Sequence, residues 1–168
     1  MDIIVRSETR LEAGGKTYAC VVGRNGITPH KSEGDGATPV GRFPLRSLRY
    51  RADRIDPPIT HLETRALTPI DGWCDAPDHP LYNHPVTLPF EASHERLWRE
   101  DNLYNLIIDL GYNDMPVEAG RGSAIFFHVM SEDASPTEGC VALHQADLLD
   151  VLALCKPDTH MDIKNPRS

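Results

Sequence analysis

The chain has 168 residues, of which 40% are hydrophobic and 25% are charged. These are ordinary proportions for a globular protein, and we expect one domain spanning residues 1–168. The net charge of −8 and the isoelectric point near 5.4 argue against nucleic acid or an anionic membrane as the main partner.

The N-terminal segment, MDIIVRSETRLEAGG, has no basic stretch followed by a long apolar one, so we recognise no signal peptide. No part of the sequence approaches the roughly 18 apolar residues of a membrane span. We therefore expect a cytoplasmic protein, or a periplasmic one if a leader has been removed.

The first forty-five residues predict short strands and tight turns. IIVRS, TRLEA and TYACVVG are β-rich runs, and Gly14-Gly15 predicts a hairpin turn between the second and the third. A Gly-rich loop follows, in which Thr38-Pro39 and Gly41 bracket a turn before the strand FPLRSLRYR. Its glycines fit neither GxGxxG nor a Walker A motif, so we do not interpret the loop as a phosphate site.

The middle of the chain, residues 52–92, holds many of the 14 prolines and predicts an irregular connection that can form a lid. The next segment, SHERLWREDNLYN, predicts one short helix with Ser93 as its N-cap, although Arg96 stands where a capping box has Glu.

Two strong strands are predicted in LYNLIIDLGYN and GSAIFFHVM. HQADLLDVLALCK has apolar residues at helical spacing and predicts a helix that Pro157 stops, and MDIKNPRS predicts an edge strand. The expected fold is mainly β, a single-domain sandwich or small barrel with one or two helices.

Two residues in the C-terminal third have the chemistry of a nucleophile and a base. Cys140 follows a glycine in SPTEGCVAL, and His128 lies at the end of the apolar run IFFHV. An adjacent histidine can orient and deprotonate a thiol, and N–H groups near Thr137 and Gly139 can stabilise an oxyanion. The alternative is an inert turn cysteine and a core histidine.

The segment GSAIFFHVMSEDASPTEGCVAL resembles the signature of the YkuD-type L,D-transpeptidase family, in which an apolar strand ends in His and a loop leads to [ST]-x-G-C. TPVGRFPL resembles the family's upstream T-P-x-G-x-F strand entry, so the resemblance spans nearly the whole chain. It implies a β-rich L,D-transpeptidase fold, with Cys140 as the nucleophile and His128 as its base. Thr137, Glu138 and Gly139 match the loop before the nucleophile.

The resemblance also implies an enzyme without cofactors that acts on peptidoglycan stem peptides and muropeptides. Its cysteine would attack the L,D-peptide bond between a diamino acid and D-Ala, and the acyl group would pass to water or to an amine. Because we recognise no leader, we expect an L,D-carboxypeptidase of cell-wall recycling. The alternatives are transpeptidation or D-amino acid exchange, and an inactive module that binds wall peptides.

Two positions depart from the family pattern. Glu138 stands where the family often has His, and Ala142 stands where it often has Arg. We therefore expect a divergent branch with altered substrate contacts.

Other residues have less specific signals. Trp73, Tyr82 and Asn83 could line a substrate groove or pack the middle segment onto the sheet, and Arg121 could bind a carboxylate or lie solvated in a turn. We interpret His94 and Glu95 as capping or surface groups at the start of the predicted helix.

Neither a metal site nor a disulfide framework is indicated. Asp78, His79, His84 and His94 are close in sequence but lack a metal-ligand spacing such as HExxH, so we expect no metal. The cysteines form no CxxC pair, and we interpret the three besides Cys140 as structural; these are Cys20, Cys74 and Cys155.

Overall fold

The computed structural model describes residues 1–166; residues 167–168 of the expected domain lie outside this range. Its elements, in chain order, are β1 (Asp2–Ser7), β2 (Arg10–Ala13), β3 (Lys16–Val21), β4 (Ile27–Thr28), β5 (Thr38–Pro39), β6 (Gly41–Tyr50), β7 (Glu63–Ala66), β8 (Asp71–Cys74), β9 (Pro85–Thr87), β10 (His94–Arg96), β11 (Leu106–Leu110), β12 (Phe126–Val129), β13 (Val141–Leu143), α1 (Gln145–Leu152) and β14 (His160–Ile163). The fold is mainly β, as predicted, with one helix among the described residues.

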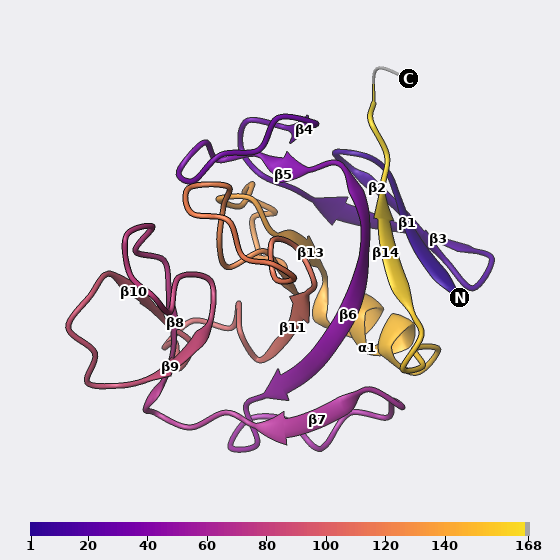
Figure 1. Cartoon of the computed structure of the whole chain (residues 1–168). Helices are drawn as coiled ribbons and strands as arrows, with labels where there is room; N and C mark the ends of the chain where they lie inside the picture. The colour runs from indigo at the N-terminus through magenta and orange to yellow at the C-terminus, as the bar shows by residue number, and fades with distance from the viewer. Residues whose placement is uncertain (167–168) are drawn as a thin grey trace.

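The largest sheet closes on itself. Its nine strands follow the order β11-β12-β13-β3-β2-β1-β14-β6-β7, and β11 also pairs with β6, which closes a barrel to which β7 adds an outer strand. The long strand β6 curves across the molecule, and α1 lies beside the barrel (Figure 1). Closure removes free strand edges, which would otherwise invite pairing with other chains.

Alternating side chains divide the apolar residues between two clusters. Leu106 and Ile108 of β11 and Phe127 of β12 belong to the main barrel core, whereas Ile107 and Phe126 point the other way into a second cluster. This division is expected because successive side chains of a β-strand point to opposite faces of the sheet. The second cluster includes Cys140, so the nucleophile candidate lies on the outer face of the barrel wall.

The segment before β11 forms no helix, so the helix predicted over SHERLWREDNLYN is wrong. His94–Arg96 is instead strand β10, which joins β8 and β9 in a three-stranded sheet of order β10-β8-β9 beside the barrel (Figure 1). Glu95 pairs with Trp73 in this sheet, and Leu97 is fully buried in the second cluster. Tertiary pairing and burial therefore outweigh the local helix signal.

Other predicted elements are confirmed with adjusted bounds. The Gly14-Gly15 turn joins β2 to β3, with both glycines at positive φ. The predicted helix ends at Leu152, before Pro157. The predicted C-terminal strand is present as β14, but its predicted place at an edge is wrong, because β14 lies inside the sheet between β1 and β6. Within residues 1–166, no helix is long and apolar enough to cross a membrane.

Candidate active site

A cavity of about 560 Å³ lies where the outer face of β12 and β13 meets the three-stranded sheet. Cys140 and His128 both line it, and so does the loop that precedes Cys140. Strand register explains this, because His128 pairs with Ala142 in the parallel β12–β13 ladder. Cys140 precedes Ala142 by two residues and therefore faces the same side of the sheet.

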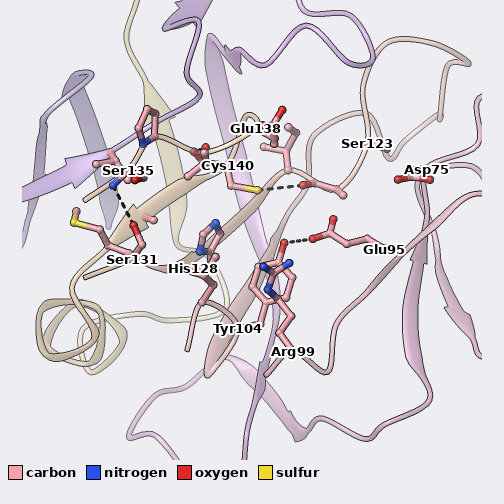
Figure 2. A pocket seen from close by; sticks show the side chains of 18 of the residues that line it. Asp75, Glu95, Arg99, Tyr104, Ser123, His128, Ser131, Ser135, Glu138 and Cys140 are labelled. Atoms are coloured by element: carbon pink, nitrogen blue, oxygen red, sulfur yellow. Dashed lines mark hydrogen bonds between the residues drawn. The ribbon is translucent and has the colours of Figure 1, made fainter. Parts of the chain in front are cut away.

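The Cys140 thiol is held by the backbone of the preceding strand region. Its Sγ donates to the Ala124 carbonyl oxygen at 3.2 Å and accepts from the Phe126 N–H at 3.3 Å. The residue is 8% exposed, and its sulfur lies beside the cavity (Figure 2). The thiol is thus oriented by two hydrogen bonds and remains accessible from one side.

The loop before Cys140 is anchored by two threonine hydroxyls. Thr38 Oγ1 donates to the Gly139 carbonyl at 2.8 Å, and Thr137 Oγ1 donates to the Cys140 carbonyl at 2.6 Å. Gly139 has a φ of +145°, and a Cβ there would lie 2.9 Å from the Ala37 carbonyl oxygen. Glycine is therefore required by both its conformation and its close backbone neighbour.

The loop has fewer free N–H groups than its sequence suggests. The Thr137 N–H donates to the Val22 carbonyl at 2.9 Å, and the Gly139 N–H donates to Thr137 Oγ1 at 3.1 Å. Neither is available to an oxyanion. The N–H groups of Glu138 and Cys140 are the remaining candidates in this loop.

His128 has a defined orientation and tautomer. Its Nδ1 lies 2.8 Å from the Val129 carbonyl oxygen, which can only accept, so Nδ1 carries the proton and Nε2 is the basic nitrogen. The Tyr104 ring packs edge-on against the imidazole at 5.2 Å between centroids. The side chain is 4% exposed, and burial lowers the pKa of His128 to about 4.

The candidate nucleophile, Cys140, is a neutral thiol at rest. Burial and the nearby Glu95 carboxylate raise the pKa of Cys140 to about 12. Burial also raises the pKa of Glu95, although the hydrogen bond from the Tyr104 hydroxyl acts in the opposite direction. A neutral thiol and a neutral imidazole in one cavity suit proton transfer during attack rather than a standing thiolate–imidazolium pair.

Comparison with known families gives one match that covers nearly the whole chain. The model of the L,D-transpeptidase catalytic domain family, YkuD, matches residues 2–163. The chain belongs to this family. Membership supports cysteine catalysis of the L,D-transpeptidase type on peptidoglycan. No curated protein matches the chain at a significant level.

The two departures from the YkuD pattern have different surroundings. Ala142 is fully buried in β13 and forms part of the cavity wall next to His128, so this position contributes no cation. The Glu138 side chain is exposed at the rim and forms an ion pair with Arg24. Substrate contacts that need a positive charge must therefore come from elsewhere in this L,D-transpeptidase domain.

The four residues predicted to touch substrate do not line the cavity. Trp73 and Tyr82 are buried, and Asn83 Oδ1 accepts from Trp73 Nε1 and from the Ala124 N–H, both at 3.0 Å. These side chains hold the segment whose carbonyl receives the Cys140 S–H bond. Arg121 is exposed and lies 3.6 Å from Glu118. Trp73, Tyr82 and Asn83 thus have the packing role that the sequence left open, and contact of these four residues with a substrate stays a prediction.

The cavity also contains residues that sequence reasoning missed. Glu95 and His94, interpreted as capping or surface groups, both line it, because β10 faces the barrel wall. Tyr104 and Arg99 line it as well, and the Arg99 guanidinium lies 5.2 Å from the Tyr104 ring centroid. No sequence motif marks these residues, since their proximity to Cys140 comes from the packing of the three-stranded sheet.

Neither metal ligands nor disulfides organise the described residues. Within residues 1–166, no three His, Cys, Asp or Glu side chains are placed to share a metal ion. The other cysteines are buried free thiols, in accord with a structural role; these are Cys20, Cys74 and Cys155.

Proposed function

We propose that the protein cleaves the L,D-peptide bond of peptidoglycan stem peptides through an acyl-enzyme on Cys140. His128 Nε2 takes the thiol proton as Sγ forms a bond to the carbonyl carbon of the third residue. The N–H groups of Glu138 and Cys140 hold the oxyanion. The C–N bond then breaks, and His128 returns the proton to the departing D-Ala amine.

One observation carries the proposal. Cys140 and His128 come from adjacent parallel strands, face the same side of the sheet and line one cavity. The hydrogen bond from His128 Nδ1–H to the Val129 carbonyl oxygen leaves Nε2 as the nitrogen that can accept a proton. Figure 2 shows the two side chains on one side of the cavity.

We take water as the acyl acceptor, which makes the protein an L,D-carboxypeptidase. His128 removes a proton from a water molecule as the water oxygen attacks the thioester carbon. The C–S bond then breaks, and Cys140 returns to the thiol. The volume of about 560 Å³ suits one peptide end, and water needs no second peptide site. The cellular location, predicted as cytoplasmic or periplasmic, stays a prediction.

Mass spectrometry with a defined tetrapeptide stem tests this function. The parent should release D-Ala and tripeptide, and should carry an acyl adduct on Cys140 that Cys140→Ala lacks. Turnover by the variant should fall at least about 1,000-fold, because Cys140 is the one cysteine among the described residues that line the cavity. Adding a D-amino acid acceptor tests the acyl fate. An exchange product without tripeptide would overturn the choice of water.

A second candidate is an inactive module that binds wall peptides. The raised pKa of Cys140 and the departures at Glu138 and Ala142 favour it. The same experiment separates the two functions. Binding of the tetrapeptide with neither adduct nor tripeptide identifies the binding module, whereas an adduct on Cys140 excludes it.

A further inference from the structure

The cavity has an unbalanced charge. Its lining contains two cationic side chains, Lys31 and Arg99. Both are already neutralised by aspartates that do not line the cavity. Lys31 Nζ lies 2.5 Å from Asp35 Oδ1, and Arg99 forms a bidentate pair with Asp101 at 2.9 and 2.6 Å.

Three carboxylates that line the cavity have only hydroxyl donors on their side chains. Glu33 accepts from Tyr82 and Ser123, Asp75 accepts from Ser93 at 2.6 Å, and Glu95 accepts from Tyr104. Among residues 1–166, no ion pair joins these three carboxylates to a cation, whereas Glu138 at the rim pairs with Arg24. These three carboxylates therefore lack an ion-pair partner among the described residues, although the nearby Arg99 guanidinium favours the charged form of Glu95.

Glu95 occupies the most consequential position of the three. It is partly buried in β10, and its field acts on the Cys140 thiol on one side and on Asp75 on the other. Figure 2 shows Glu95 between the Tyr104 hydroxyl and Asp75. Tyr104 in turn packs against His128. A carboxylate in the same cavity as the proposed nucleophile opposes formation of the thiolate, and the smaller effect of Lys31 offsets this opposition only in part.

We propose that Glu95 binds the free side-chain ammonium of the residue whose carbonyl Cys140 attacks. This inference rests on the proposed function and names the residue that recognises the third side chain of the stem peptide, whose amine must be free. The bound ammonium pairs with the Glu95 carboxylate through a charge-assisted hydrogen bond. It also removes the repulsion that Glu95 exerts on the developing thiolate. Recognition and activation are thereby coupled in one contact.

Single-turnover acylation with two matched peptides tests the contact. One tetrapeptide stem has L-lysine at position three and D-Ala at position four, and the other has Nε-acetyl-lysine, which lacks the charge. The parent should be acylated about tenfold faster or more by the lysine peptide, as expected for a hydrogen bond to a charged group. Glu95→Gln should reduce this ratio to less than about threefold. The glutamine retains an oxygen that accepts from Tyr104.

Glu100→Gln is the matched control. It removes the same charge five residues away, at an exposed side chain outside the cavity lining, and should retain the parent ratio. Equal acylation of the parent by both peptides, or an unchanged ratio in Glu95→Gln, would overturn the proposal. Equal acylation with an amine-dependent deacylation step would also overturn it, because Glu95 would then serve the acceptor.

Binding to the Cys140→Ala variant gives a readout that does not depend on turnover. Calorimetry should show tighter binding of the lysine peptide than of the acetyl-lysine peptide, and adding Glu95→Gln should remove the difference. If the parent forms no adduct with either peptide, the proposed function fails, and this binding difference still decides the ammonium site. Equal binding of the two peptides by Cys140→Ala would refute the site even if acylation occurs.

Discussion

At the scale of single residues, this site combines the proposed nucleophile and base with a neighbouring carboxylate, Glu95. Burial disfavours the charged form of both Cys140 and His128, and Glu95 disfavours the thiolate further. Both groups are therefore neutral at rest. Catalysis by such a pair requires His128 to accept the proton as the bond to substrate forms.

The low pKa of His128 leads to a prediction about pH. An imidazole with a pKa of about 4 is neutral, and able to accept a proton, well below the usual range of histidine. Activity should be retained as the pH falls from 7 to 5 and should be lost as it falls through about 4. The pH profile of kcat/KM measures this limb for the free enzyme.

Glu95 also titrates in the cavity, so the profile should be repeated with Glu95→Gln. If the loss of activity at low pH comes from protonation of His128, the Glu95→Gln variant should show the same loss. Circular dichroism at each pH separates loss of the base from loss of the fold. An acid limb near 6.5, with the fold intact, would show that His128 is solvated like a free imidazole.

At the scale of elements, the proposed nucleophile depends on a loop that two segments distant in sequence hold, one around Gly23 and one at Thr38. Thr38 in β5 is fully buried and bridges two backbones, because its Oγ1 accepts from the Gly23 N–H at 2.9 Å and donates to the Gly139 carbonyl. Thr137 forms a bridge to Gly23 and thereby joins the same group. The threonine of the upstream T-P-x-G motif therefore has a structural role, because it anchors the loop before Cys140.

Thr38→Val should destabilise the protein and slow acylation. The substitution keeps the side-chain size but leaves a buried N–H and a buried carbonyl without their partner, at a cost of about 2 kcal/mol in the free energy of unfolding. Acylation should fall roughly tenfold or more, because the oxyanion donors shift with the loop. Urea denaturation and single-turnover kinetics measure the two effects.

Thr64→Val in β7 is the control, because Thr64 is exposed and its hydroxyl contacts only the nearby Leu62 carbonyl. Its unfolding free energy should stay within about 0.5 kcal/mol of the parent. If Thr38→Val were as stable and as fast as Thr64→Val, Thr38 would not anchor the loop.

At the scale of the whole molecule, the C-terminal strand completes the barrel. β14 lies parallel to β1 and antiparallel to β6, so the end of the chain joins two strands from its beginning. The side chains of Met161 and Ile163 enter the main core. The barrel wall that supports β12 and β13 is thus closed by residues distant from the site.

Ile163→Ala should therefore cost about 2–5 kcal/mol in the free energy of unfolding, as for other large-to-small core substitutions. Ile59→Ala makes the same chemical change at a side chain that is 82% exposed rather than 1% exposed, and should cost less than about 0.5 kcal/mol. Urea denaturation compares the two variants. Similar losses of stability would mean that β14 does not stabilise the barrel core.

The sequence by itself determined much of this protein. Alternating apolar residues predicted the β fold, Gly14-Gly15 predicted its hairpin, and the motifs around Cys140 and His128 indicated the family that the match confirms. These signals are local, because strand periodicity, turn chemistry and a nucleophile motif are each contained in a short stretch of chain.

Only the tertiary structure decided the rest. Barrel closure, the central place of β14 and the strand at His94–Arg96 depend on pairings between segments distant in sequence, which local propensity does not encode. The same packing places Glu95 in the lining of the cavity, whereas Trp73 and Asn83 do not line it. Charge balance in the cavity is likewise a property of three-dimensional neighbours, because electrostatic interactions depend on distance and burial rather than on sequence spacing.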